Sequence, residues 1–500
     1  MTKPLRILML ASEMIPYAKT GGLADVIGAL PAALRALGHE VIVVIPRYRG
    51  IEPGRYKMKR IGEVQVPLGD RVIGAGVDQV PGDGDPTVLF IDRKSYFDRE
   101  ALYGTPQGDF PDNAERFAFF GRAALAACTL LSWTPDVVHA HDWQAGLAPA
   151  LLAYNLCPPG RFAKAGRVFT IHNLAYQGSF EPAALDLAGL PPSSFTPEGV
   201  EFFGKISFLK AGIVYSDAIT TVSRKYAEEI QTPEFGCGME GILTRRKADL
   251  AGILNGVDYA EWDPRHDPDL PAHYGPEDLS GKRKCKEALL ARVGLPAALL
   301  KKPLIGMIGR LADQKGMDLV AASIRKILAL DTGMVILGSG DARYHRLLAE
   351  VAKRESGRAA IVLAFDNALA HQIEAGSDIF LMPSRYEPCG LNQIYSLRYG
   401  TVPVVRATGG LDDTIEPFDP RTGSGTGFKF HDYTAEAMLE ALTAAVTLWR
   451  SDRERWEGLL REGMRRDFSW HASARRYVEV YRQAIRRRRS GRPDLEGWTA

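Results

Sequence analysis

The feature that most constrains the fold of this chain is an alternation of short apolar strand patterns with helical segments, which occurs twice. In the first half the strand patterns are RILMLA, HEVIVVIPRY, PTVLFID, PDVVHA, RVFTIHN and DAITTVS. In the second half they are KPLIGMIGRL, MVILGSG, AAIVLAF, DIFLMPS and TVPVVRA. Because parallel strands are joined by crossover helices, this pattern predicts two α/β domains, each built on a parallel sheet.

The length of the chain agrees with this division, since 500 residues exceed what one hydrophobic core usually serves. We expect the domains to occupy residues 1–254 and 255–470, followed by a helical tail over 471–500. Within this framework, residues 50–84 are predicted to form an added hairpin, residues 176–205 to be loop-like, and the polar stretch up to about residue 300 to be a crossover connection.

Charge and cysteine usage exclude several classes of protein. The 62 basic and 60 acidic residues give a net charge of +2, so no broad field attracts nucleic acid or an anionic membrane. The apolar run after Lys3 and Arg6 is too short for a signal peptide, and no later segment has the length of a membrane span. The five cysteines form no C-x-x-C pair, so neither disulfides nor structural zinc are predicted. We expect a cytoplasmic enzyme.

The stretch AKTGGLADVIGALP places Lys19, Gly21 and Gly22 between the first strand and the first helix. Loops at the carboxyl ends of parallel strands line ligand sites, and the unpaired N–H groups at a helix amino terminus favour an anion. Phosphate or carboxylate is the predicted ligand. A flexible surface lysine beside a glycine turn is the alternative interpretation.

A second pair of cations follows a strand in the second half. Arg310 ends the pattern PLIGMIGRL, and Lys315 with Gly316 precedes the next helix. Each cation by itself could be a surface charge, but together at one strand-to-helix turn they predict a diphosphate clamp.

Glu387, in the loop after DIFLMPS, has two interpretations. It can stabilise the start of the next helix, or its carboxylate can accept hydrogen bonds from the hydroxyl groups of a sugar. Cys389 by itself is typical of a small buried residue. The glycine turn RATGG over residues 406–410 could direct N–H groups toward phosphate.

The motifs HAHDW and TIHN end two strands of the first half and contain His139, His141, Asp142 and His172. The histidines lack a helical spacing for metal ligands, so a hydrogen-bonding role fits better than metal binding. For His139 a structural role is an equal alternative. No G-x-G-x-x-G follows a convincing strand, which argues against a dinucleotide-dependent dehydrogenase.

The ordered motifs KTGGLADVIGALP, HAHDWQ, TIHNLAYQG, NGVD, IGRLADQKG, SRYEPCGLNQ and TGGLDDT extend along most of the chain. This set resembles the bacterial glycogen synthases and the related plant starch synthases. The resemblance implies the GT-B fold, in which two Rossmann-like domains face each other across a deep cleft, with the acceptor glucan on the first domain and the nucleotide sugar mainly on the second. It also implies that the tail packs back on the first domain.

The resemblance further implies transfer of glucose from ADP-glucose, or UDP-glucose in some members, to the non-reducing end of an α-1,4-glucan with retention of configuration, without a metal or other cofactor. The catalytic group it implies is Lys19 at the distal phosphate and glucose, His172 near the reacting carbon, Arg310 and Lys315 at the diphosphate, and Glu387 at the glucosyl hydroxyls. The substrate-binding group it implies is Gly21, Gly22, Asp25, Asp142, Asn173, Tyr176, Asn255, Cys389, Gly390, Leu391, Thr408, Gly409 and Gly410.

One position departs from the wider group of retaining GT-B enzymes, which often carry a second glutamate eight residues after the first. Here that position is Tyr395, as in this subfamily, so we favour front-side attack by the acceptor hydroxyl, with Glu387 as a sugar-binding residue. Two alternatives are a phosphorylase with lysine-bound pyridoxal phosphate and a non-catalytic glucan-binding protein. The sequence shows no convincing lysine-anchored cofactor motif, and the presence of all three cations with Glu387 argues against a decayed scaffold.

Overall fold

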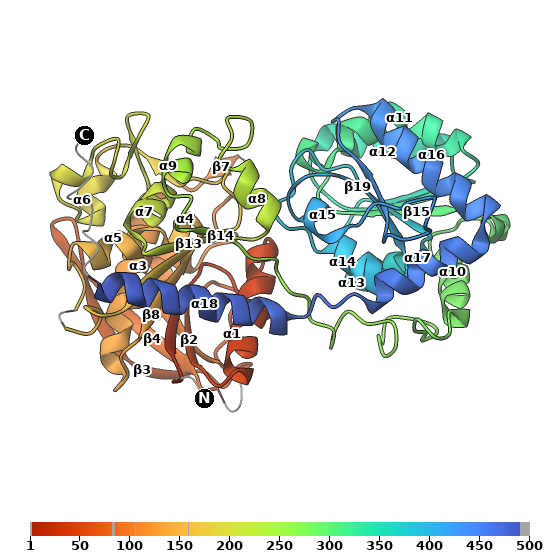
Figure 1. The fold of residues 1–500 in the computed structure, drawn as a ribbon. Coiled ribbons are helices and arrows are strands. Elements are labelled where there is room, and N and C mark those ends of the chain that lie inside the picture. Colours follow the sequence, from red (N-terminus) through yellow and green to blue (C-terminus); the bar gives the residue numbers. More distant parts are fainter. Residues whose placement is uncertain (1–2, 83–85, 106, 159, 491–500) are drawn as a thin grey trace. The chain divides into compact units, whose positions relative to one another are not determined.

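The computed structural model describes residues 3–82, 86–105, 107–158 and 160–490, and these form two compact units (Figure 1). Unit 1 comprises the chain up to Val222, Ala227–Gly256 and the segment from Trp470; unit 2 comprises Ser223–Tyr226 and Val257–Ser469. The long segment of unit 2 therefore begins after residue 256 and ends before residue 470. The ranges predicted from the sequence change after residues 254 and 470. Residues 491–500 of the predicted tail lie outside the described residues.

Unit 1 is built on a nine-stranded sheet. In sheet order the strands are β14 (Leu250–Gly252), β13 (Ala218–Thr221), β9 (Gly166–Ile171), β8 (Val137–His141), β1 (Arg6–Leu10), β2 (Glu40–Pro46), β5 (Thr87–Asp92), β4 (Arg71–Val80) and β3 (Lys59–Leu68). From β14 to β5 all neighbours are parallel. The central strand β1 pairs with β2 on one side and with the much later β8 on the other, so the strand order changes direction between β1 and β8.

Helices and short elements complete unit 1. They are α1 (Gly22–Ala36), α2 (Lys94–Phe97), β6 (Gly104–Thr105), β7 (Gly108–Asp109), α3 (Asn113–Ala127), η1 (Cys128–Leu130), α4 (Asp142–Ala145), α5 (Leu147–Ala153), α7 (Phe208–Tyr215), α9 (Glu240–Arg245) and α18 (Trp470–Arg489). The helix α8 (Arg224–Glu229) is divided, with its residues up to Tyr226 in unit 2 and the rest in unit 1. The last helix, α18, packs along β9 and α1 (Figure 1). This approach is close, because a Cβ atom built on Gly166 of β9 would lie 2.8 Å from the backbone nitrogen of Ile485.

Two segments of unit 1 can be compared with the elements predicted from the sequence. The hairpin predicted over residues 50–84 is formed by β3 and β4, which pair antiparallel, while residues 83 and 84 lie outside the described residues. The loop-like prediction for residues 176–205 was wrong in part, since this segment holds β10 (Ser179–Phe180), α6 (Ala184–Ala188), η2 (Pro192–Ser194), β11 (Glu201–Phe202) and the start of β12 (Lys205–Ser207). Strands of two or three residues are too short to show a period of hydrophobicity.

Unit 2 is built on a six-stranded, fully parallel sheet. In sheet order the strands are β17 (Ala359–Val362), β16 (Gly333–Leu337), β15 (Leu304–Ile308), β18 (Ile379–Met382), β19 (Val402–Arg406) and β20 (Phe428–Phe430). Numbered within the unit this order is 3-2-1-4-5-6, the doubly wound arrangement in which ligands bind at the carboxyl ends of the strands where the order reverses. That reversal lies between β15 and β18.

The helices of unit 2 alternate with its strands as predicted. They are α10 (Ser280–Arg292), η3 (Ala297–Lys301), η4 (Asp313–Lys315), α11 (Met317–Ala329), α12 (Ala342–Arg354), α13 (Asn367–Gly376), α14 (Asn392–Arg398), α15 (Gly409–Thr414), α16 (Ala435–Ser451) and α17 (Arg453–Arg465). The crossover predicted up to about residue 300 ends within η3 and contains the whole of α10. Its sequence SGKRKCKEALLAR is largely charged, and only Cys285, Leu289 and a few neighbours are buried, so the apolar stripe that would identify a helix is narrow.

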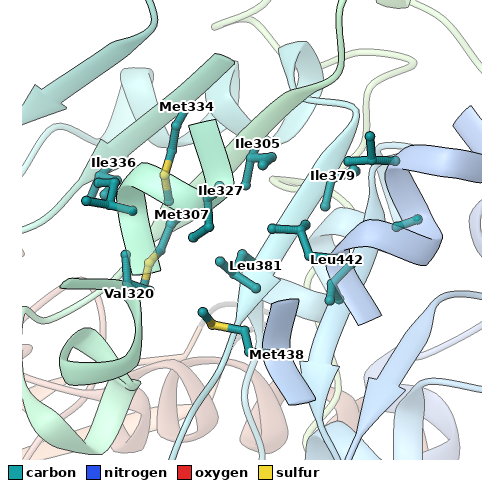
Figure 2. Packing of buried hydrophobic residues seen from close by; sticks show 14 of the residues in the cluster. Ile305, Met307, Val320, Ile327, Met334, Ile336, Ile379, Leu381, Met438 and Leu442 are labelled. Atoms are coloured by element: carbon teal, nitrogen blue, oxygen red, sulfur yellow. The ribbon is translucent and has the colours of Figure 1, made fainter. Parts of the chain in front are cut away.

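The core of unit 2 forms between its sheet and the helices α11 and α16 (Figure 2). Ile305 and Met307 of β15 and Leu381 of β18 lie beside Val320 of α11 and Leu442 of α16. Strands covered on both faces read as continuous apolar runs, and all five residues of β16 are buried. This packing fixes the carboxyl ends of β15 and β18 side by side.

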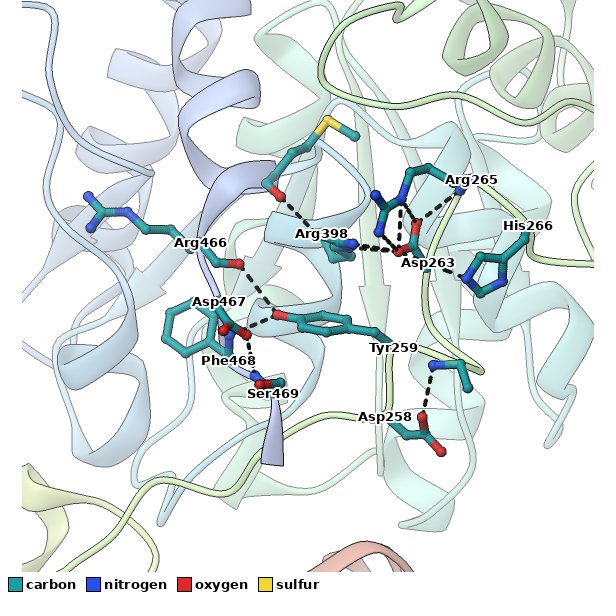
Figure 3. Close-up of polar contacts among 12 residues, drawn as sticks. Asp258, Tyr259, Asp263, Arg265, His266, Arg398, Arg466, Asp467, Phe468 and Ser469 are labelled. Carbon is teal, nitrogen blue, oxygen red and sulfur yellow. Dashed lines mark hydrogen bonds and ion pairs between the residues drawn. The ribbon is translucent and has the colours of Figure 1, made fainter. Parts of the chain in front are cut away.

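The two ends of unit 2 are joined to each other near Tyr259 (Figure 3). The Val257 amide donates to the Phe468 carbonyl at 2.9 Å, and the Phe468 amide donates to the Tyr259 hydroxyl at 2.9 Å. Close by, the buried Asp263 carboxylate pairs with Arg265 and Arg398. Burial raises the pKa of Asp263, but its hydrogen bonds to these arginines outweigh that effect and hold it at about 2. These hydrogen bonds thus join the two ends of the segment Val257–Ser469.

No helix among the described residues combines the length and the apolar composition needed to cross a membrane.

Candidate active site

The loop between β1 and α1 places the first candidate cation. Lys19 Nζ lies 2.6 Å from Asp25 Oδ1, in the first turn of α1, and the Lys19 side chain is half exposed. Burial raises the pKa of Asp25, and the neighbouring Lys19 ammonium opposes this shift. Cβ atoms built on Gly21 and Gly22 would meet no atom within 4 Å, so these glycines leave open space beside the lysine. A ligand group can approach the loop backbone there.

The buried carboxylate of Glu13 holds this loop, and the sequence motifs did not identify it. Glu13 accepts hydrogen bonds from the Thr20 hydroxyl at 2.6 Å, from the Gly21 amide at 3.2 Å and from the Thr20 amide. The Tyr103 hydroxyl donates to the same carboxylate at 2.6 Å. Two of the loop amides expected to bind an anion are therefore already bound to a protein carboxylate, which fixes the loop and leaves Lys19 as the charge available to a ligand.

Asp142 lies at the carboxyl end of β8, directly next to β1 in the sheet. It has a φ of 55°, which is rare for a residue other than glycine, and its Oδ1 accepts the His172 amide at 2.7 Å. Burial raises the pKa of Asp142 to about 7, although backbone N–H groups of His172 and Asn173 lower it. The carboxylate thereby ties the end of β8 to the loop after β9. Further along that loop, Tyr176 is 52% exposed.

Three histidines form one buried cluster at these strand ends. His141 Nδ1 lies 3.0 Å from His172 Nε2. His139 contacts the Thr170 hydroxyl at 2.6 Å through Nε2 and the Tyr481 hydroxyl of α18 at 3.0 Å through Nδ1. Burial lowers the pKa of His172 to about 3 and those of His139 and His141 well below their usual range. The cluster is therefore neutral near pH 7.

This neutrality makes unit 1 sensitive to acid, and the share of His139 can be measured. An unfolded histidine ionises near pH 6.5, whereas folded His139 stays neutral. Below about pH 6.5 the unfolded state therefore binds more protons than the folded state, and the free energy of unfolding decreases as the pH is lowered. Between about pH 7 and about pH 5, we expect the melting temperature of His139→Gln to decrease less than that of the parent. In unfolding free energy the two slopes should differ by up to about 1.4 kcal/mol per pH unit. Calorimetry of both proteins measures the two slopes.

The comparison with the parent cancels other groups, including Asp142, whose raised pKa acts in the opposite direction. Parallel slopes for parent and variant would contradict a neutral His139.

Unit 2 brings its candidate residues together where its strand order reverses. Lys315, in the loop after β15, places its Nζ 2.5 Å from Oε2 of Glu387, in the loop after β18. The Ser384 hydroxyl donates to the same oxygen at 3.1 Å, and Glu387 is 5% exposed. Arg310, in the same loop as Lys315, donates to the Gln314 side chain at 2.8 Å. Gly316 permits this approach, because a Cβ there would lie 2.1 Å from the Pro383 carbonyl oxygen and its φ is 73°.

The glycine turn after β19 packs against the Glu387 loop. The Gly410 amide donates to the Glu387 carbonyl at 3.0 Å. Cβ atoms on Gly409 and Gly410 would each lie 1.9 Å from a carbonyl oxygen, of Glu387 and of Cys389 respectively. The Gln393 side chain also donates to the Cys389 and Gly390 carbonyls. These glycines are needed for close packing between the two loops.

The predicted residues thus fall into two groups. Unit 1 holds, around the ends of β1, β8 and β9, Lys19, Gly21, Gly22, Asp25, Asp142, His172, Asn173 and Tyr176. Unit 2 holds Arg310, Lys315, Glu387, Cys389, Gly390, Leu391, Thr408, Gly409 and Gly410. Asn255 lies in unit 1, directly before the last residue of that segment, Gly256. Its buried Oδ1 has no hydrogen-bond partner among the described residues. The sequence reasoning missed Glu13, Tyr103 and Ser384, and it expected a hydrogen-bonding role for His141 without naming a partner.

Within the described part of the chain, Asp267, Asp269 and His371 of unit 2 have the residue types of a metal site. The Asp267 carboxylate already accepts hydrogen bonds from the Tyr399 hydroxyl, from His371 Nδ1 at 2.7 Å and from the Asp269 amide at 2.9 Å. Its oxygens are satisfied by the protein, so the cluster is explained as a structural network.

Each of the two units contains a segment that matches the model of a known protein family. Residues 6–245 match the family model of the starch synthase catalytic domain, and residues 296–458 match that of glycosyl transferases group 1. Proteins named glycogen synthase from Koribacter versatilis and Anaeromyxobacter dehalogenans are each 50% identical to this chain over 96% of its length, and the matches cover 98% and 99% of those proteins.

Among solved structures, the catalytic domain of starch synthase IV from Arabidopsis thaliana, bound to ADP and acarbose, superposes with a TM-score of 0.89 at 33% identity. The match covers 97% of this chain and all of that one. A sucrose-phosphate synthase from Thermosynechococcus elongatus, at 16% identity and a TM-score of 0.58, shares the fold. The α/β, GT-B fold class predicted from the sequence is confirmed. With half of its residues identical to these relatives over nearly its whole length, the chain is a glycosyltransferase that belongs to the glycogen synthase family.

Proposed function

We propose that this enzyme transfers glucose from ADP-glucose to the non-reducing end of an α-1,4-glucan, with retention of configuration and release of ADP. The observation that carries the proposal is the Lys315–Glu387 pair at the strand reversal of unit 2, with Arg310 in the same loop. A cation and a carboxylate placed there suit a ligand with a diphosphate at one end and sugar hydroxyls at the other. The relative that binds ADP and acarbose supports an adenine nucleotide as the leaving group.

In this proposal the cations act on the leaving group. As the bond between the glucosyl C1 and the diphosphate oxygen breaks, negative charge grows on the diphosphate. Arg310, Lys315 and Lys19 stabilise that charge more in the transition state than in the ground state, which accelerates bond breaking without a metal ion. Lys19 and Lys315 each lie beside a carboxylate that orients the ammonium group before the donor binds.

The acceptor step follows from the position of Glu387. Both of its side-chain contacts use Oε2, which leaves Oε1 for the sugar hydroxyls. We propose that Glu387 binds the sugar and does not attack C1. The 4-hydroxyl of the glucan attacks C1 from the face that the diphosphate leaves, the new C–O bond forms, and its proton passes to the departing phosphate oxygen. We also propose that unit 1 supplies the acceptor side and unit 2 most of the donor side. All five cysteines are free thiols, which supports the cytoplasm as the location.

A donor assay tests the proposal. We expect the enzyme to release ADP from ADP-glucose only when glycogen is present, more rapidly than it releases UDP from UDP-glucose, and to add α-linked glucose to the glycogen. EDTA should leave the rate unchanged, because protein cations stabilise the leaving group. Nucleotide release without glycogen, or activity that EDTA abolishes and divalent ions restore, would contradict the mechanism.

A further inference from the structure

The buried bond between His141 and His172 couples the protonation of the two rings. His141 Nδ1 and His172 Nε2 are 3.0 Å apart, and one of these nitrogens must carry the shared proton. A neutral imidazole has a single N–H, so this choice also fixes which nitrogen of each ring is bare. Whether the remaining nitrogen of His172, Nδ1, is a donor or an acceptor toward a ligand therefore depends on His141.

The second ring nitrogen of His141, Nε2, indicates which of the two histidines donates the hydrogen bond. Its Nε2 is buried and has no hydrogen-bond partner within the described part of the chain. If His172 were the donor, His141 would carry its proton on Nε2, as a buried N–H without an acceptor. If His141 donates from Nδ1, only a lone pair remains unused there. Orphaned buried N–H groups are rarer in proteins than underused acceptors, so donation from His141 Nδ1 is favoured.

The ring of His141 is held in place by its neighbour His139. The centroids of the two rings are 3.9 Å apart. His139 is itself anchored through both nitrogens, to Thr170 of β9 and to Tyr481 of α18. The last helix of the chain thus supports the orientation on which the His141–His172 bond depends.

We propose that His141 is a positioning residue that holds His172 as the neutral Nδ1–H tautomer, so that His172 presents a hydrogen-bond donor to an oxygen atom of the glucosyl unit. This role rests on the proposed function, since it assigns His172 to the sugar. Burial, which lowers the pKa of both histidines, keeps the pair neutral, so a single shared proton defines the arrangement.

Nitrogen-15 NMR of the histidine-labelled full chain tests the tautomer without any substrate. Comparison with His172→Gln assigns the His172 signals, and the shift of each nitrogen distinguishes a protonated from a bare one. We expect the Nδ1–H tautomer in the parent and in His141→Asn, whose amide N–H replaces the donor. In His141→Phe, which has no donor, we expect Nε2–H. A parent spectrum with the proton on Nε2 overturns the proposal, and this result does not require that the Phe variant fold.

Kinetics give the second measurement. We expect His141→Phe to lower kcat roughly tenfold, the effect of one hydrogen bond, with an unchanged KM for glycogen, and His141→Asn to recover most of that loss. His471→Phe, at an exposed position of α18, is the matched control and should behave like the parent. Equal losses in the Asn and Phe variants would overturn the proposal. A parent that transfers no glucose would refute the proposed function instead and leave the tautomer measurement standing.

Discussion

Replacement of Lys315 by methionine is expected to lower the turnover of glucosyl transfer by about 100- to 1,000-fold, the cost of losing one preorganised group that stabilises transition-state charge. Methionine keeps most of the length of the side chain but carries no charge. The Lys315 ammonium lies at the strand reversal of unit 2, where the proposed diphosphate leaves. Since the interaction strengthens as negative charge grows, kcat should fall more than the affinity for the donor.

The variant also leaves the buried Glu387 carboxylate without its cation, which can destabilise unit 2 by itself. The double variant Lys315→Met/Glu387→Gln removes the unpaired charge while the cation stays absent. It is compared with Glu387→Gln alone, because Glu387 is itself assigned to the sugar. We expect the double variant to recover melting temperature but not turnover. Lys326→Met, at an exposed position of α11, is the charge-matched control and should retain parental activity. Full recovery of turnover in the double variant would show that Lys315 acts only on stability.

Replacement of Gly410 by alanine is expected to have the second large effect. The new Cβ would lie 1.9 Å from the Cys389 carbonyl oxygen and 2.5 Å from Cys389 Cα, so the backbone of the Glu387 loop must move. Overpacking of this kind costs about 1–3 kcal/mol in stability. A shift near 1 Å in a group that positions the donor can lower catalysis by about 100-fold. Steady-state kinetics with ADP-glucose and thermal unfolding measure the two effects.

Gly458→Ala provides the matched control in the same unit. This glycine is exposed in α17, and a Cβ there would meet no atom within 4 Å. Since alanine favours a helix over glycine by up to about 1 kcal/mol, this variant should be at least as stable as the parent and fully active. A Gly410→Ala enzyme with parental kinetics would show that the Glu387 loop does not need its observed position.

Much of each unit could be predicted because the signals are local. The strands β1, β2, β15 and β18 and the helix α1 follow from apolar runs and turn residues within a few positions of each other. The placement of Lys19 and Lys315 in strand-to-helix loops follows from the same signals. Elements with weak local signals were missed, such as the three-residue β20 and the largely charged α10, whose buried face is recognised only when α13 packs against it.

The contacts that prepare the candidate site could not be predicted, because their partners are distant in the sequence. Glu13 is one of 60 acidic residues, and nothing near it in the chain indicates that Tyr103 will bind its carboxylate. The hydroxyl that contacts His139 Nδ1 likewise comes from α18, 342 positions further along the chain. Their roles arise from burial and from hydrogen bonds between elements.

The sequence by itself determined the family, the twice-repeated α/β pattern and the loops that carry the candidate residues, since local periodicity and ordered motifs are written in neighbouring positions. Only the tertiary structure decided that β1 pairs with β8 and β15 with β18. These pairings between distant strands bring the Lys19 loop beside Asp142 in one unit and Lys315 within hydrogen-bond distance of Glu387 in the other. The physical reason is that strand order is set by the burial of both sheet faces and by backbone pairing across long loops, which no local pattern encodes.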